Sequence, residues 1–390
     1  MSEIKVNSIK GVGASAAAIT VNNTDGTCTA NLSNRQNKNL IINGDFKISQ
    51  RSTSSSTTGY ATVDRWKTDR SGLDESPTFS QADVTSGTTP YTNGFRKAFK
   101  ITNGNQTSGA GSGDYLYFFQ KIEAQDIAQS GWDYISSSSY VTLSFWVKSS
   151  VAQNFYGYLR SMDGTSKIYP FETGALSADT WTKITKTIPG ATGNQIDNDN
   201  GEGLRVVIAP FWGTDLTASS VNLNQWATFA SSTRAPDYTS TWYTTNDATF
   251  EITGVQLEAG STATNFEHRS FGQELQLCSR YYQQWAAITS GSSNDNAVAV
   301  MANFNATHAY GRIPYLNGPM RAAPSITQSN NSYFTNGASF SGLTYTISGA
   351  STTAMEANVS ASSGNWTAGH AGWLRALTGA GGQFALNAEL

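Results

Sequence analysis

Hydrophobic and polar residues alternate in short runs along most of this chain. A period of two predicts strands, because successive side chains of a strand point to opposite faces of its sheet. Clusters of Gly, Ser, Asn and Pro between the runs predict turns. The predicted strands are Leu40–Ile42, Ala98–Ile101, Tyr115–Ile122, Tyr140–Val147, Phe155–Leu159, Trp181–Ile188, Leu204–Phe211, Phe250–Leu257, Ala297–Met301 and Gly342–Ile347.

The spacing of these runs divides the chain into regions. About eight strands with long polar connections in the middle of the chain are typical of a double-sheet jelly roll. We therefore predict an all-β protein with an N-terminal extended attachment segment at 1–38, a jelly-roll β-sandwich at 39–268, a linker helix at 269–285 and a C-terminal β tip domain at 286–390.

The linker helix is predicted from its capping residues and its period. Ser270 as N-cap and Gln273 three residues later form a capping box. The apolar residues that share one face of this helix are Phe271, Leu275, Cys278 and Tyr282. A helix this short needs a partner, so this face packs either on the jelly roll or on a second copy of the chain. The four residues are therefore the candidate oligomer interface.

The N-terminal segment contains too few large apolar side chains for a core of its own. Two short β-prone runs flank a turn signal at Asp25-Gly26. We expect the segment either to be a flexible tail or to become ordered by docking on a partner. The apolar residues available for docking are Ile4, Val6, Ile9, Ile19 and Val21.

Composition narrows the classes of partner. Of the 390 residues, 14% are charged, against about 25% in an ordinary soluble protein, and 12% are aromatic. The net charge of −3, without any Lys/Arg cluster longer than a pair, argues against nucleic acid as a partner. No apolar run approaches the roughly 18 residues of a membrane span, and the N-terminus lacks a signal peptide. We therefore expect synthesis in a cytosol and no membrane insertion. Cys28 and Cys278 are predicted to be unpaired thiols.

Catalytic and metal-binding patterns are weak in this sequence. Glycoside hydrolysis needs two carboxylates at a fixed separation, and nothing shows that Asp64, Asp69 or their acidic neighbours converge. The three histidines are scattered, and neither cysteine has a partner at zinc-ligand spacing. In the acidic loop that begins at Asp197, glycine falls at the fifth position rather than the sixth, which breaks the EF-hand pattern. We predict no enzyme activity and no required cofactor.

Two segments carry a family resemblance. They are NLIINGDFKISQR at Asn39–Arg51, with DRW at Asp64–Trp66, and FEITGVQLEAGSTATNFEHRSFGQELQLCSRYYQQW at Phe250–Trp285. They resemble tail-fibre and related virion proteins of bacterial viruses, and PMRAAPS at Pro319–Ser325 is similar to the distal part of such fibres. The resemblance covers Asn39–Tyr282 well.

This resemblance implies a homotrimeric tail fibre, made in the host cytoplasm and located in the virion tail. Its N-terminal segment would dock on tail adaptor or nozzle proteins, and its distal end would adhere to a host cell-surface glycan. A head fibre or capsid-decorating protein is the first alternative, and a glycan depolymerase is the second.

The ends of the predicted jelly roll carry a further resemblance. Asn43–Phe46 and Ile252–Val255 resemble the first and last strands of carbohydrate-binding-module jelly rolls, which lie close together. Such modules often hold a structural calcium ion there, with Asp45 and Glu251 as the acidic residues in this chain. Thr253, however, replaces the aspartate that is common near the last strand.

Sugar recognition needs aromatic faces for the apolar side of the ring, and amides or hydroxyls for its hydroxyl groups. The candidate carbohydrate-binding aromatics are Tyr156, Tyr158, Trp212, Trp242 and Tyr243 in the jelly roll, and Tyr333, Phe334, Trp366 and Trp373 in the C-terminal region. Each is also a typical core residue of a β protein, and the sequence leaves both interpretations open.

Overall fold

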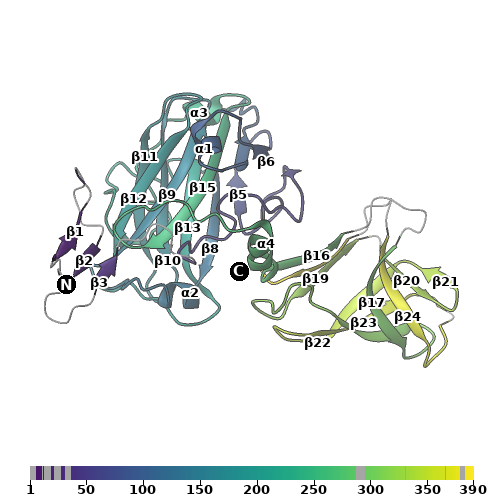
Figure 1. Ribbon diagram of the computed structural model, residues 1–390. Coiled ribbons are helices and arrows are strands. Elements are labelled where there is room, and N and C mark those ends of the chain that lie inside the picture. The colour runs from purple at the N-terminus through teal and green to yellow at the C-terminus, as the bar shows by residue number, and fades with distance from the viewer. Residues whose placement is uncertain are drawn as a thin grey trace, which may run out of the picture.

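The computed structural model describes residues 6–10, 12, 19–21, 28–30, 37–286, 295–329, 331–364, 366–377 and 383–390. Every strand pair among these residues is antiparallel and the helices are short, which confirms the all-β prediction. Figure 1 shows a small N-terminal sheet, a larger β body and a smaller C-terminal β body, with one helix, α4, between the two bodies.

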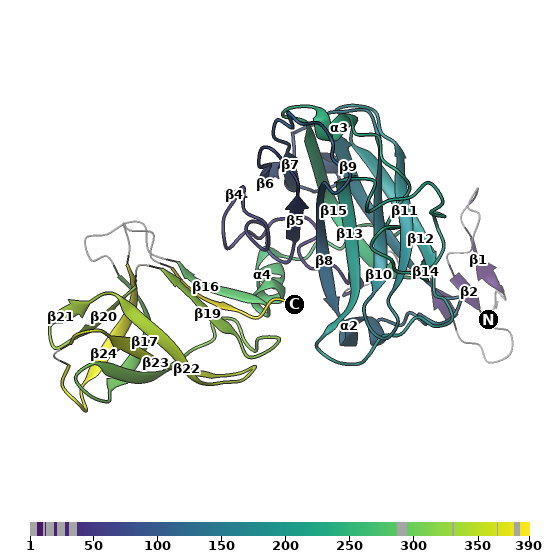
Figure 2. The same cartoon turned by 180° about the vertical axis from the view of Figure 1, so that it is seen from behind.

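The N-terminal sheet has three short strands, β1 (Ser8–Ile9), β2 (Ile19–Val21) and β3 (Cys28–Ala30). The pairing of β2 with β3 agrees with the two predicted β-prone runs, whereas the Asp25-Gly26 turn lies outside the described residues. Figure 2 shows this sheet on the side of the larger body that faces away from the C-terminal body. The segment thus extends from the rest of the chain.

The larger body is a sandwich of two six-stranded sheets, which confirms the jelly-roll β-sandwich. The first sheet, in spatial order, contains β14 (Ala227–Thr228), β11 (Lys167–Ala175), β10 (Asn154–Ser161), β13 (Glu202–Trp212), β8 (Tyr115–Glu123) and β5 (Lys67–Ser71). The second sheet contains β12 (Thr182–Pro189), β9 (Tyr140–Ser149), β15 (Thr249–Ala259), β7 (Lys97–Thr102), β6 (Thr78–Asp83) and β4 (Ser54–Ser55). Three short helices cap the strand ends: α1 (Thr89–Thr92), α2 (Ala124–Ala128) and α3 (Thr241–Thr244).

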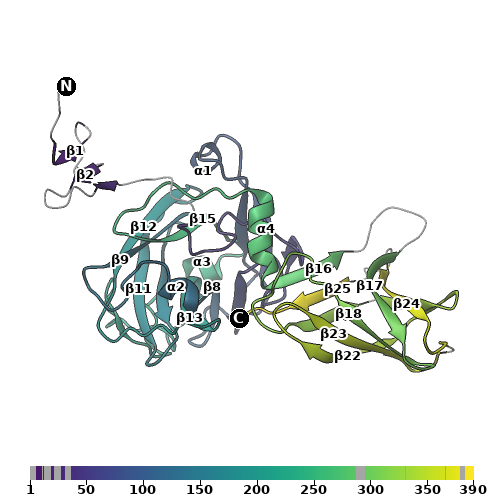
Figure 3. The same ribbon diagram turned by 60° about the horizontal axis from the view of Figure 1, so that its bottom comes forward.

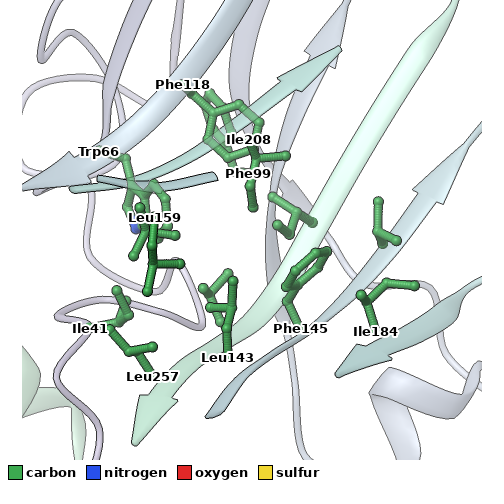
Figure 4. Packing of buried hydrophobic residues seen from close by; sticks show 14 of the residues in the cluster. Ile41, Trp66, Phe99, Phe118, Leu143, Phe145, Leu159, Ile184, Ile208 and Leu257 are labelled. Carbon is green, nitrogen blue, oxygen red and sulfur yellow. The ribbon is translucent and has the colours of Figure 1, made fainter. Parts of the chain in front are cut away.

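The core of the sandwich is aromatic and comes from both sheets (Figure 4). Phe99 of the second sheet meets Phe118 of the first with ring centroids 5.1 Å apart, and Trp66 lies 5.8 Å from Phe118. All three side chains are at most 1% exposed. Because each buried aromatic removes a large apolar area from water, these contacts hold the two sheets face to face.

Some strand predictions are wrong because burial and strand periodicity do not coincide in those segments. Leu40–Ile42 is not a strand but an irregular segment beside β15, with a hydrogen bond from the Leu40 amide to the Leu257 carbonyl. Its residues Leu40 and Ile41 contribute to the sandwich core without belonging to a sheet, and Ile41 is fully buried there. Conversely, β5 and β6 were not predicted, because their sequences KTDRS and TFSQAD are largely polar.

The ends of the jelly-roll segment do lie side by side, as the resemblance to carbohydrate-binding modules predicts. The Val255 amide donates a hydrogen bond of 2.9 Å to the Gly44 carbonyl. Asn43 fixes this opening segment further, because its amide group donates to the Ile48 and Asp64 carbonyls.

The smaller body has its own aromatic and aliphatic core around Trp285, Tyr333 and Trp366. A three-stranded sheet contains, in spatial order, β16 (Tyr282–Ala286), β25 (Gln383–Asn387) and β19 (Ser325–Ser329). A seven-stranded sheet contains β21 (Ala338–Phe340), β20 (Asn331–Thr335), β24 (Ala371–Leu377), β17 (Asp295–Asn303), β18 (His308–Ile313), β23 (Met355–Ala361) and β22 (Leu343–Ala350). The predicted domain boundaries themselves stay predictions.

The predicted linker helix is α4 (Phe271–Ser279), between the two bodies in Figure 3. Its capping box is present: the Ser270 hydroxyl accepts from the Gln273 amide, and the Gln273 side chain accepts from the Ser270 amide. Local sequence therefore fixes where this helix begins.

Buried charges join the two bodies directly after α4. Glu123, at the end of β8, is fully buried and accepts hydrogen bonds of 2.8 and 2.7 Å from Arg280 and another from the Tyr281 hydroxyl. Arg65, also buried, pairs with Glu389 and lies over the Tyr281 ring at 3.3 Å. Since an unpaired buried charge is costly, each member of this network depends on the others.

Candidate functional site

Most of the predicted sugar-binding aromatics are core residues. The buried ones are Tyr158, Trp212, Trp242, Tyr243, Tyr333 and Trp366, none more than 3% exposed. A ring without an exposed face cannot stack on a sugar, so the structure corrects the sequence-based assignment of these six. Packing between strands is the cause: the Tyr158 ring stacks on Trp212 at 5.4 Å.

Three predicted aromatics keep some exposure. Tyr156 is half-buried and meets the ring of Tyr238 edge-on at 4.9 Å. Phe334 is half-buried and Trp373 is 49% exposed. The structure brings Phe334 and Trp373 together, because they are paired residues of β20 and β24.

Phe334 and Trp373 belong to an apolar row on the outer face of the seven-stranded sheet. Val300, the residue paired with Trp373 on β17, is 62% exposed. The Arg375 guanidinium lies over both rings, 4.3 Å from Phe334 and 5.0 Å from Trp373. This distal row presents an indole face that is open to a ligand.

The predicted oligomer face of α4 is divided between core and surface. Cys278 and Tyr282 are buried within the chain, against the prediction that they meet a second copy. Contrary to the prediction, Tyr282 is not part of the helix but the first residue of β16, and Arg51 covers its ring at 3.6 Å. Burial also raises the pKa of the Cys278 thiol. Leu275 is half-buried, whereas Phe271 is 62% exposed.

The predicted attachment residues lie on the small N-terminal sheet or next to it. Val6 and Ile9 are 45% and 54% exposed, and Ile19 and Val21 are half-buried. Ile4 lies outside the described residues. Exposed apolar side chains on so small a sheet are open to contact with another protein.

A hollow of about 260 Å³ lies on the outer face of the second sheet of the sandwich. We call it the Trp146 hollow. Its described lining residues are Asn93, Phe95, Ser144, Trp146, Lys183, Gly254, Thr264, Asn265, Phe266 and His268. They come from β9, β12 and β15, which lie side by side in Figure 1, and from the segments after α1 and β15.

Strand geometry places Trp146 on the floor of this hollow. Val147 and Phe145 point into the sandwich core, so Trp146 between them points outward and is half-buried. Lys183 of β12 and Thr253 of β15 are its paired neighbours. Thr253 is fully buried, and its hydroxyl donates to the Lys97 carbonyl at 2.7 Å, which fixes the sheet beside the indole.

Three rings in edge-on or tilted contact form one wall of the hollow. The ring centroids of Phe95 and Phe266 are 4.9 Å apart, and His268 lies 5.1 Å from Phe95 and 5.0 Å from Phe266. The exposed His268 ring is also held by a 2.9 Å hydrogen bond between its Nε2 and the Asn93 carbonyl. Contacts within the chain therefore hold the wall in place.

A bulge in β15 makes room for this wall. The register of β15 against β9 shifts between Thr253 and Gln256, and Gly254 has a φ of 65°. A Cβ atom on Gly254 would lie 2.5 Å from the Phe95 ring. Only glycine combines this backbone conformation with so close an aromatic neighbour.

The rim of the hollow carries the polar residues Thr264 and Asn265. The Thr264 hydroxyl is engaged within the chain, because it donates to Glu258 at 2.6 Å and accepts from Lys38. The amide side chain of Asn265 is exposed. An aromatic floor and wall with amide and hydroxyl groups at the rim is the arrangement that sugar rings require.

Trp146 lies in a strand that the sequence predicts, but it is not one of the predicted sugar-binding aromatics. A signal was available: Thr142, Ser144 and Lys148, which share the face of Trp146, are all polar, so that face is not a core face. Phe95 and His268 carried no such signal, because more than a hundred residues separate them along the chain.

The described residues show no metal centre. Asp45, a candidate calcium ligand, pairs with Lys47 at 2.7 Å, and Glu251 pairs with Lys148 at 3.0 Å. No group of three His, Cys, Asp or Glu side chains within the described part of the chain could hold a metal ion. In the same part of the chain, no helix is both long and apolar enough to cross a bilayer.

No protein-family model and no curated protein sequence matches the chain. Among solved structures, the enzymatically active domain of tailspike protein 4 from bacteriophage CBA120 has a TM-score of 0.31 and 12% identity, covering 57% of this chain and 21% of that one. A putative sugar binding protein from Bacteroides thetaiotaomicron has a TM-score of 0.31 and 13% identity over 57% of this chain and 100% of its own. The N-terminal cellulose-binding domain of β-1,4-glucanase C from Cellulomonas fimi has a TM-score of 0.25 and 10% identity over 55% and 97%. Likenesses this distant assign no function to the chain.

Proposed function

We propose that this chain is a glycan-binding protein whose sugar site is the Trp146 hollow. The observation that carries the proposal is a half-buried indole beside a wall of three rings and a rim of amides and hydroxyls, in a hollow of about 260 Å³. This volume is slightly smaller than the roughly 300–1,000 Å³ of ligand pockets, which suits a single sugar ring of a longer glycan.

The sequence resemblance places this activity in a virion fibre of a bacterial virus, and we propose a homotrimeric tail fibre that adheres to host surface glycan. The exposed Val6 and Ile9 are available for docking on a tail adaptor or nozzle protein. The distal row, with Trp373 at its centre, is a second surface for host contact. In a trimer, binding at one sugar site raises the effective concentration of glycan at the other two sites, so the overall affinity exceeds that of a single site.

The binding proposal is tested by replacing the floor of the hollow. Trp146→Ala should abolish or weaken glycan binding at least tenfold in isothermal titration calorimetry, because stacking on an indole face is lost. Phe304→Ala is the matched control, since it removes a 69% exposed aromatic side chain of the smaller body that belongs neither to the hollow nor to the distal row. Equal binding by the Trp146→Ala variant, with unchanged circular dichroism, would exclude the hollow as the sugar site.

The fibre proposal is tested by mass and location. Light scattering should give about three times the chain mass of 41.8 kDa. Antibodies against the N-terminal segment should label the tail rather than the head, which separates the tail fibre from the head-fibre alternative. A monomer in light scattering would contradict the trimer. Release of reducing ends from host polysaccharide would instead favour the depolymerase.

A further inference from the structure

The charges around the Trp146 hollow are of one sign. Its described lining residues include Lys183 and His268 but no Asp or Glu. Lys183 is exposed and is paired across the strands with Trp146. Lys183 therefore lines the same hollow as the indole on which a sugar ring would stack.

The next row of the same sheet face adds further positive charge. Lys148 follows Trp146 on the same face of β9, and its ammonium lies 5.3 Å from the Trp181 ring centroid. Glu251, paired with Lys148 at 3.0 Å, is also the strand neighbour of Lys100. One carboxylate thus lies between two lysines, and the row keeps an excess of positive charge.

The other charged groups nearby are already balanced. Lys97 pairs with Asp83 at 2.6 Å, and Glu258, which holds Thr264, lies 3.9 Å from Lys38. The chain as a whole has a net charge of −3, so the positive sign of this face is local and opposite to that of the molecule. A neutral sugar would gain nothing from such a local field, whereas an anionic one would be attracted to it.

We propose that the Trp146 hollow selects an anionic saccharide, whose acidic group lies against Lys183 while its ring stacks on Trp146. This inference rests on the proposed glycan-binding function and adds the class of ligand. Lysine is a compact point charge that does not distinguish a carboxylate from a sulfate by geometry. The shared chemistry is therefore a sugar with a negative charge.

The experiment uses matched probes that differ only in charge. Oligogalacturonate is compared with its methyl ester, sialyllactose with its methyl ester, and a carrageenan oligosaccharide with its desulfated form, by calorimetry on the full chain. We expect the acidic member of at least one pair to bind roughly threefold to tenfold more tightly than its neutral partner, as one charge-assisted contact supplies. The preference should decrease between 50 and about 300 mM salt, as screening requires.

Variants assign the effect to one side chain. Lys183→Gln should remove the preference for the acidic member, Lys183→Arg should keep it, and Lys10→Gln, an exposed lysine on the N-terminal segment, should leave it unchanged. Two results overturn the anionic inference: equal affinity for both members of every pair, or a preference for the acidic member that survives Lys183→Gln. In either case, binding of the neutral probes still supports the glycan-binding function. Binding to none of the six probes overturns the anionic inference. If a wider panel of neutral glycans also fails to bind, the glycan function itself is overturned.

Discussion

Glu123 is the buried carboxylate that holds the segment after α4 on the larger body, and its removal gives a quantitative prediction. It accepts hydrogen bonds from Arg280, Tyr281 and Gln125 and has no exposed surface. Breaking a buried ion pair from one side costs about 3–5 kcal/mol. Because the Arg280 side chain is 33% exposed and is partly hydrated without its partner, we expect Glu123→Ala to cost about 3 kcal/mol, near the lower end of that range.

Thermal unfolding is the assay for this loss. At about 2–4 °C for each kcal/mol, the transition that includes the junction should fall by about 6–12 °C. Asp83→Ala is the matched control, because it breaks an ion pair of 2.6 Å whose partners are 36% and 82% exposed. Such surface pairs contribute roughly 0–1 kcal/mol. If Glu123→Ala costs no more than Asp83→Ala, the junction is not held by this network.

The pH dependence gives the same prediction a second test. Burial favours the protonated form of Glu123, yet the hydrogen bonds from Arg280 and Tyr281 outweigh burial and hold its pKa below the ordinary value. A carboxyl group with a lowered folded pKa stabilises the protein above its unfolded pKa and loses this effect as the pH falls through the folded value. The difference between wild type and Glu123→Ala should therefore shrink on acidification.

Two further predictions concern the backbone of the hollow and the junction. Gly254→Ala should lower the free energy of unfolding by about 1–3 kcal/mol and weaken glycan binding, because the added Cβ would lie 2.5 Å from the Phe95 ring. Gly272→Ala is the control and should not destabilise the protein, because there is open space around Gly272. Equal melting temperatures for the two variants would refute this prediction. Burial raises the pKa of Asp64 to about 6, so its stabilising contribution is complete below its unfolded pKa of about 4 and is lost as the pH rises through 6. Asp64→Asn should remove this part of the pH dependence in urea unfolding, about 3 kcal/mol across the window, and an unchanged slope would contradict it.

Local sequence was sufficient for the elements whose signal is local. Apolar and polar residues alternate in the strands predicted at β9 and β15, and a nearly continuous apolar run predicted β13. Burial does not follow this alternation everywhere, because β13 and β15 are buried on both faces. Ser270 and Gln273 predicted the start of α4, because a capping box involves only neighbours in the chain.

Tertiary structure decided which aromatic residues are accessible. Tyr333 and Phe334 are adjacent in sequence and equally aromatic, yet Tyr333 is fully buried and Phe334 is half-exposed, because neighbours on a strand point to opposite faces. Which face is the core depends on the sheet that packs against it, and the sequence does not specify this partner.

The Trp146 hollow shows the same limit for a site. The sequence placed Trp146 on a strand. The wall of the hollow, however, contains Phe95 and His268, which come together only when β7, β9 and β15 pair. Alternation along a strand is set by backbone geometry and can be predicted from one segment. Contacts across strands depend on register and topology, which are fixed by the burial of the whole core and so appear only in the folded chain.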